Sequence, residues 1–377
     1  MYLDGAATTK PSELSLKLFN EVSKNYWYNP SSMSEKAHEA YMLLANARII
    51  IANKINCDPV NIIFTSGATE GANMIMRGFH VDNIVVSRIE HPCVYNTAME
   101  LGKSGDANIA VVDVDHYGLV DRRMLEDTLT LYEQRNERTL VCIMDTNNEI
   151  GTIQPTRLIS HIVHDHEGCF LFSDMTQSFA HSQNVDVEDL CVDFACGSAH
   201  KFGGFKGVGF IYTKYPLSPL LTGGHQEDGY RAGTENVAAI WAMAKQFEEV
   251  RDDMLINYIA TNMKSLYLQT LLKMNIDGVT INGTGLGVPD IVSVTLPDGD
   301  ANTIISLLDD GYDIQVSAGS ACSSGDNKPS RILKAIGLSD EEARRTLRIT
   351  VDPEYSDEKY EDFVKILKQL MNTTKGG

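Results

Sequence analysis

The sequence contains no apolar run of about 18 residues, the length that a helix needs to span a bilayer. Its first residues, Met-Tyr-Leu-Asp, lack the positive charge with which a secretory signal peptide begins. Clusters of Lys or Arg are also missing, and the formal net charge is −19. We therefore expect a cytoplasmic protein that binds neither a membrane nor nucleic acid directly.

Further absences exclude particular kinds of structure and binding site. The chain has no Cys-x-x-Cys pair, and its cysteine count of seven is odd, which argues against a disulfide framework. Most of the cysteines lie in apolar segments and are expected to be reduced and packed. Gly-Thr-Gly-Leu-Gly at 283–287 lacks the complete Gly-x-Gly-x-x-Gly spacing, so a dinucleotide site is excluded. We see no internal repeats, and we expect no metal site.

The length of 377 residues is too great for one compact core. We predict a large domain over residues 12–250 and a smaller α+β C-terminal domain over 251–377, joined by an N-terminal segment, 1–11. A continuous helical pattern from 237 to 274 carries the chain from one domain to the other.

Short apolar segments alternate with helical ones in the first two thirds of the chain. The expected strands are 62–64, 83–87, 110–114, 140–145, 170–173 and 192–196. Such alternation predicts an α/β domain whose central sheet is mostly parallel and is flanked by helices.

Polar residues follow the ends of these strands, which is where ligands bind in open α/β sheets. Lys201 stands between two apolar runs and beside glycines, and a lysine in such surroundings is a candidate nucleophilic amine. The loop Thr-Ser-Gly-Ala-Thr-Glu-Gly at 65–71 leads from a strand into a helix and suits a phosphate. Taken singly, each could be a surface lysine, a turn or a helix cap. Their joint position at strand ends favours a site.

A second unusual segment is Ser-Ala-Gly-Ser-Ala-Cys-Ser-Ser-Gly at 317–325. It places Cys322 among small polar residues, where a structural thiol would gain nothing from packing. We expect this thiol to be exposed and reactive.

These motifs, in their order along the chain, resemble those of the cysteine desulfurases of the NifS/IscS kind, within the class V aminotransferase group of pyridoxal-phosphate enzymes of fold type I. The resemblance extends over nearly the whole chain. Its motifs are Thr-Ser-Gly-Ala-Thr-Glu, Glu-His-Pro, Asn-Asn-Glu-Ile-Gly, Ser-Ala-His-Lys, Arg-Ala-Gly-Thr-Glu-Asn and Gly-Ser-Ala-Cys-Ser-Ser-Gly.

The resemblance implies a role for each matched residue. Lys201 would bind the cofactor covalently and move protons, His91 would stack on the ring and serve as acid or base, and Cys322 would accept the sulfur atom. Asp174 would meet the pyridine nitrogen, and Gln177 the ring oxygen. The remaining cofactor contacts would hold the phosphate, and they are Ala68, Thr69, Ser198, His200 and, from the neighbouring subunit of a homodimer, Thr234. Asn148 and Arg348 would hold the substrate carboxylate.

The implied reaction converts L-cysteine to L-alanine and leaves a persulfide on Cys322. Its sulfur would pass to an acceptor protein, such as an iron–sulfur scaffold or a thiolation enzyme. Two alternatives within the same fold stay open, a selenocysteine lyase and a true aminotransferase. A sulfur carrier or scaffold-binding protein that has lost catalysis is the alternative outside the enzymes.

Overall fold

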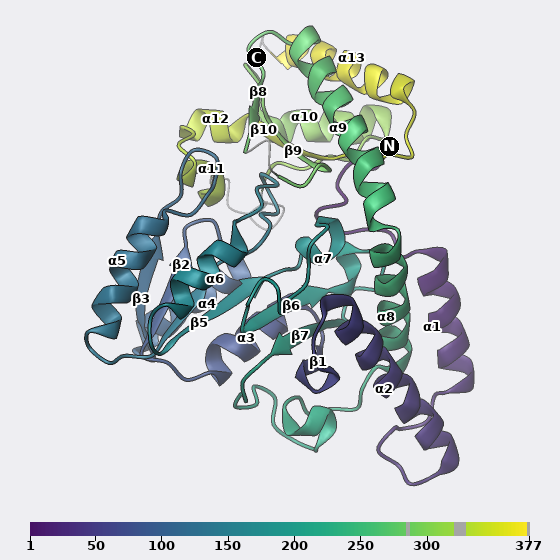
Figure 1. Ribbon diagram of the computed structural model, residues 1–377. Coiled ribbons are helices and arrows are strands. Elements are labelled where there is room, and N and C mark those ends of the chain that lie inside the picture. Colours follow the sequence, from purple (N-terminus) through teal and green to yellow (C-terminus); the bar gives the residue numbers. More distant parts are fainter. Residues whose placement is uncertain (284–286, 320–328, 375–377) are drawn as a thin grey trace.

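The computed structural model describes residues 1–283, 287–319 and 329–374, and it contains two sheets (Figure 1). One has seven strands from the span 62–213, and the other has three strands from the span 280–350. The predicted domain boundary at residue 250 stays a prediction. None of the helices in the described part of the chain combines the length and the hydrophobicity of a membrane span.

The seven-stranded sheet has the order β1-β7-β6-β5-β4-β2-β3. Its strands are β1 Ile62–Thr65, β2 Asn83–Ser87, β3 Asn108–Val112, β4 Thr139–Cys142, β5 Cys169–Asp174, β6 Phe194–Ser198 and β7 Gly209–Thr213. Only β7 runs against its neighbours, β1 and β6. The carboxyl ends of the other strands therefore share one edge, and the prediction of a mostly parallel sheet is confirmed.

Helices cover both faces of this sheet, which explains why its strands are almost unbroken apolar runs. In β2, Val85 packs into one hydrophobic cluster, while Ile84 and Val86 pack into the cluster on the other face. The helices of the first cluster include α2 Glu35–Ile55, α5 Arg122–Glu133, α6 Thr156–His164 and α8 Val237–Asp252, and those of the second are α3 Ala68–Gly78 and α4 Pro92–Ser104. Shorter elements are η1 Pro59–Asn61, α7 Ser178–His181, η2 Ala199–Lys201 and η3 Gln226–Gly229.

The single helix predicted over 237–274 is two helices. Asp253, with φ −91° and ψ 0°, is both the C-cap of α8 and the N-cap of α9, Met254–Asn275. Helix α8 packs against α1 (Glu13–Asn25) and α2, whereas α9 reaches the smaller sheet (Figure 1). The break therefore falls where the chain leaves one sheet for the other.

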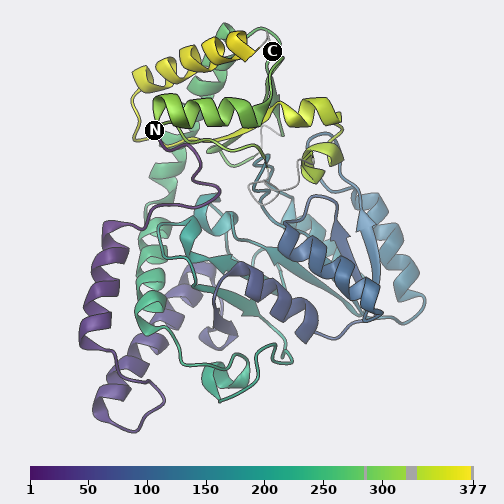
Figure 2. The ribbon, with the colours of Figure 1, turned by 180° about the vertical axis from the view of Figure 1, so that it is seen from behind.

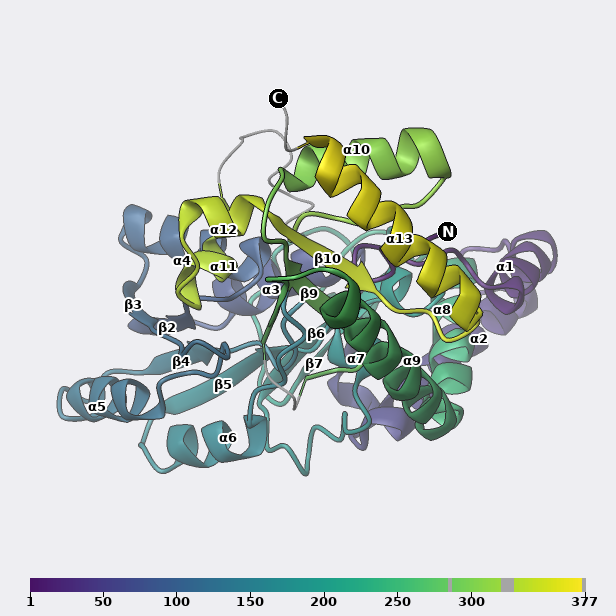
Figure 3. The same ribbon diagram turned by 90° about the horizontal axis from the view of Figure 1, so that it is seen from above.

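The smaller sheet is antiparallel, in the order β10-β9-β8, and it lies beneath a layer of helices (Figure 3). Its elements are β8 Thr280–Asn282, β9 Ile291–Thr295, α10 Ala301–Tyr312, α11 Arg331–Ala335, α12 Asp340–Arg344, β10 Thr346–Thr350 and α13 Asp357–Thr374. The first residues of the chain join this unit before they run to α1 (Figure 2). Leu3 is fully buried in its core, donates to Gln315 O at 2.8 Å and accepts from Thr350 N at 2.7 Å.

Candidate active site

A cavity of about 410 Å³ opens at the carboxyl edge of the large sheet. Strands β1, β2, β4, β5 and β6 all end there, and each is followed by residues that line the cavity. The predicted site residues in its lining are Ala68, Thr69, His91, Asn148, Asp174, Gln177, Ser198, His200 and Lys201. The sheet topology thus brings together residues that lie more than a hundred positions apart in the sequence.

One end of the cavity is the start of helix α3. Gly67 is its N-cap and forms no side-chain cap, so the first amide N–H groups of the helix have no acceptor within it. Gly67 has φ +149°, and a Cβ atom there would lie 3.3 Å from Ser198 Oγ. A glycine keeps this corner free for a group that the helix N-terminus attracts, and an anion suits it.

His91 caps helix α4 and faces Cys93. Its Nδ1 accepts a hydrogen bond from the Cys93 amide at 3.2 Å and lies 3.0 Å from Cys93 Sγ. Burial raises the pKa of the Cys93 thiol well above its usual value. Burial also lowers the pKa of His91, and the Asp174 carboxylate opposes this lowering. A neutral ring that accepts at Nδ1 carries its proton on Nε2.

Asp174 is the last residue of β5 and is buried, with Oδ1 accepting from Thr176 N at 3.0 Å and contacted by Cys196 Sγ at 3.6 Å. Gln177, three residues on, donates through Nε2 to Ala6 O at 3.0 Å, and its Oε1 is buried without a partner in the described part of the chain.

Lys201 lies in η2, directly after β6, and is half-buried. Its Nζ donates to the backbone carbonyls of Ala6 at 2.7 Å and Ala7 at 2.9 Å. The N-terminal segment therefore forms a wall of the site. Beside it, His200 Nδ1 lies 3.1 Å from Thr8 Oγ1, and burial with the nearby Lys201 charge lowers the pKa of His200 to about 4.

Arg348, on β10, reaches the site from the smaller sheet and is only 2% exposed. It donates to Asn148 O at 2.8 Å and forms an ion pair of 2.7 Å with Asp4 Oδ1. Asn148 lines the cavity, and its Oδ1 is buried without a partner among the described residues. Arg348 itself is not among the lining residues. The two residues of the predicted carboxylate clamp thus contact each other, and the guanidinium forms an ion pair with Asp4.

Two further predicted residues stay untested. Thr234 is exposed and outside the lining, so its assignment to a neighbouring subunit stays a prediction. Cys322 lies outside the described residues.

Sequence reasoning missed one lining residue, Cys93, and one buried neighbour of His91, Glu90. We expected Cys93 to be a packed thiol, and it is buried, but it also lines the cavity beside His91. Glu90 is fully buried, accepts from Ser87 Oγ at 2.5 Å and from Met144 N at 2.9 Å, and burial raises its pKa to about 8. The signal available in the sequence was their position on either side of His91.

Potential ligand atoms of His91, Cys93 and Asp174 all lie within 4.8 Å of one another, a group of the kind that can hold a metal ion. We assign no metal to it, because the family resemblance places His91 and Asp174 against the cofactor ring. A metal ion and that ring would compete for the same atoms.

Comparison with known proteins gives one consistent result. The family model described as aminotransferase class-V matches residues 1–357. A curated relative from Dictyoglomus turgidum, "Cysteine desulfurase IscS", is 35% identical over 93% of this chain and 89% of its own length. A solved "NIFS-LIKE PROTEIN" superposes with a TM-score of 0.90 at 30% identity and covers 99% of both chains. The structure named "SspA in complex with cysteine" has a TM-score of 0.81 at 28% identity, and the match covers 94% of this chain and 99% of that one. The chain therefore belongs to the class-V aminotransferase family.

Proposed function

We propose that this protein is a pyridoxal 5'-phosphate-dependent cysteine desulfurase. It converts L-cysteine to L-alanine and holds the released sulfur as a persulfide on Cys322. The observation that carries this proposal is the single cavity in which Lys201, Asp174 and His91 meet the open N-terminus of α3. The relatives named above as desulfurases support it.

The residues present fit the cofactor. The cavity left by Gly67 would be filled by a Cβ atom, and it adjoins free helix N–H groups, Thr69 and Ser198, which suits the phosphate. Asp174, at the end of β5, would meet the protonated ring nitrogen. Gln177 brings to the same cavity a side-chain oxygen that is buried without a partner in the described part of the chain. When bound, the cofactor supplies an electron sink for the carbon that carries the substrate amine.

The protein supplies the proton positions and the geometry. Its neutral His91 can exchange a proton at Nε2, because Nδ1 is occupied by the Cys93 amide. Lys201 is held in place by two carbonyls, and to act as a nucleophile its amine must leave them and lose a proton. His200, with its low pKa, is neutral at pH 7 and adds a hydrogen-bonding group beside the phosphate without adding charge.

Arg348 and Asn148 are proposed to bind the substrate carboxylate. In the structure Arg348 Nη2 is paired with Asp4, so substrate would have to share or replace that partner. A guanidinium can serve both, since it offers five N–H donors in one plane. Sulfur transfer then requires Cys322 to take the sulfur atom from the substrate Cβ.

We also propose a homodimer, in which Thr234 of one subunit completes the phosphate site of the other. The acceptor of the persulfide sulfur would be a protein, either an iron–sulfur scaffold or a thiolation enzyme. The large negative charge favours an acceptor with a basic docking surface.

The proposal is tested with two variants of the full-length protein. Lys201→Ala should abolish both the visible absorbance of the bound cofactor and the formation of alanine. Cys322→Ser should keep the absorbance and lose the protein-bound persulfide, measured by mass spectrometry after incubation with L-cysteine. Colourless wild-type protein that cannot be loaded with cofactor would support the noncatalytic alternative. Full persulfide formation by Cys322→Ser would contradict the sulfur-transfer role.

A matched comparison of substrates separates the alternatives within the fold. The wild-type protein should release alanine from L-cysteine. Turnover of selenocysteine alone would identify a selenocysteine lyase, and amino transfer to a keto acid without sulfur release would identify an aminotransferase.

A further inference from the structure

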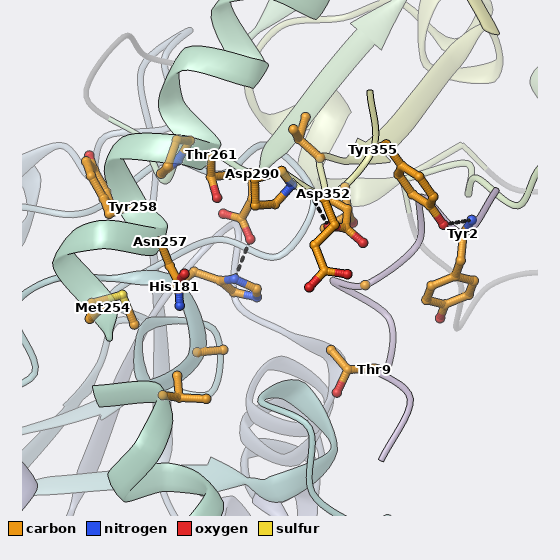
Figure 4. A pocket seen from close by; sticks show the side chains of 18 of the residues that line it. Tyr2, Thr9, His181, Met254, Asn257, Tyr258, Thr261, Asp290, Asp352 and Tyr355 are labelled. Carbon is orange, nitrogen blue, oxygen red and sulfur yellow. Dashed lines mark hydrogen bonds and ion pairs between the residues drawn. The ribbon is translucent and has the colours of Figure 1, made fainter. Parts of the chain in front are cut away.

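A second cavity, of about 600 Å³, lies where the N-terminal segment, the end of α7, the α8–α9 junction and the ends of the smaller sheet meet (Figure 4). It shares no lining residue with the active-site cavity. Gly5 and Thr9 in its wall flank the two residues whose carbonyls accept from Lys201. A volume of this size accommodates a small organic molecule.

Two side chains of the lining, His181 and Asp290, form a pair. His181 is the last residue of α7, and Asp290 directly precedes β9 of the smaller sheet. His181 Nδ1 bonds to Asp290 Oδ2, and the side chains are only 12% and 10% exposed. The other polar atom of each, His181 Nε2 and Asp290 Oδ1, is buried and has no hydrogen-bond partner in the described part of the chain. Figure 4 shows both side chains in the wall between Asn257 and Asp352.

The carboxylate of Asp290 indicates what this pair could bind. An ionised carboxylate only accepts hydrogen bonds, so Nδ1 donates to Oδ2, and Oδ1 is left as an acceptor without a donor among the described residues. A matching ligand group must offer a hydrogen-bond donor.

The charged residues that line the cavity also favour a cationic ligand. Asp290, Asp352 and Glu354 line the cavity, against a single ammonium from Lys10. The rings of Tyr258 and Tyr355 also belong to the wall, and aromatic faces attract cations.

We propose that this cavity binds the primary ammonium group of a small organic cation. An ammonium offers N–H donors, one of which can bond to Asp290 Oδ1, and its charge complements the surrounding carboxylates. The proposal does not depend on the reaction performed at Lys201, since it concerns a different set of residues.

The test measures binding of n-butylamine to the cofactor-loaded, full-length protein by isothermal titration calorimetry, in an amine-free buffer at fixed ionic strength. We expect saturable binding of one molecule per chain. Asp290→Asn should weaken it by about tenfold or more, because a charge-assisted hydrogen bond is lost. Asp277→Asn, at an exposed carboxylate outside the cavity, should leave the affinity unchanged.

Tetramethylammonium serves as the second probe, since it has the same charge but no N–H donor, and it should bind much more weakly. Should Asp290→Asn fail to fold, as judged by circular dichroism, Glu354→Gln at an exposed lining position takes its place, with an expected loss of about threefold. Absence of saturable binding, equal losses in the cavity variant and Asp277→Asn, or equal affinity for both probes would each overturn the proposal.

Discussion

Glu90 shows how strongly a single buried group can respond to its surroundings. Its Oε1 accepts two hydrogen bonds, yet its Oε2 is buried with no partner among the described residues, and burial raises its pKa to about 8. The folded protein therefore binds a proton that the unfolded chain, with a carboxyl pKa of 4.5, has already released at neutral pH. Burial shifts the pKa of the neighbouring His91 the opposite way, below its usual value.

A pH-dependent stability follows for Glu90. Because the folded-state pKa is the higher one, its contribution to the free energy of unfolding is fully present below pH 4.5 and is lost as the pH rises towards about 8. The loss approaches roughly 1.4 kcal/mol per pH unit within that window. In Glu90→Gln this part of the slope should disappear. Urea unfolding of both proteins between pH 6 and pH 8 measures it, and parallel curves would contradict the assignment.

Cys93 illustrates a second effect of burial at the residue scale. Its thiol lines the active-site cavity, but its pKa is raised, so it is a thiol and not a thiolate at neutral pH. We expect iodoacetamide to modify Cys93 much more slowly than Cys322. Peptide mass spectrometry after a short labelling pulse reports both sites, and equal rates would show that the thiol is not protected.

At the scale of elements, helix α3 carries the proposed phosphate-binding corner and must lie close against the sheet. A Cβ atom on Gly71 would come within 2.6 Å of Ile211 Cγ2 and 3.2 Å of Cys196 Cβ, so this glycine sets the distance between α3 and strands β6 and β7. Any displacement of the helix also moves Ala68 and Thr69.

We therefore expect Gly71→Ala to lower the free energy of unfolding by roughly 1–3 kcal/mol through overpacking, and to weaken cofactor binding. Gly311→Ala is the matched control, because its added methyl group meets no described atom within 4 Å beyond its own stretch of helix, and in helix α10 it should stabilise by up to about 1 kcal/mol. Urea unfolding measures the stability of the two variants, and cofactor titration measures their affinity for the cofactor. Similar behaviour of both would refute the close-packing argument.

At the scale of the whole molecule, the proposed dimer makes each site depend on two chains. Thr234→Asp would place a negative charge beside the partner's phosphate, so this homodimer should lose cofactor, as the Lys201→Ala homodimer loses activity. Mixing and re-pairing the two variants should restore about a quarter of the wild-type sites, because half of the dimers are mixed and each has one intact site. Thr270→Asp, at an exposed threonine on α9, should behave as wild type. Failure of the mixture to regain activity would remove Thr234 from the site.

Much of this architecture could be predicted because local patterns carry it. Strand β2 was predicted with its observed bounds, and the strand-end positions of His91, Asp174 and Lys201 predicted a shared site. The break at Asp253 could not be seen, because both helices continue an apolar pattern and only the packing partners change. The Asp4–Arg348 pair and the His181–Asp290 pair also escaped prediction, since each joins residues brought together solely by the tertiary fold.

The bonds between the N-terminal segment and β10 have a consequence for biosynthesis. Leu3 is fixed by Gln315 and Thr350, and the carbonyls that hold Lys201 Nζ follow it within four residues. These residues are translated well before their partners Lys201, Gln315 and Thr350. The nascent chain must therefore keep its start unattached while the large sheet forms. We expect stable capture of the cofactor to occur only after translation of β10, as a late event in maturation.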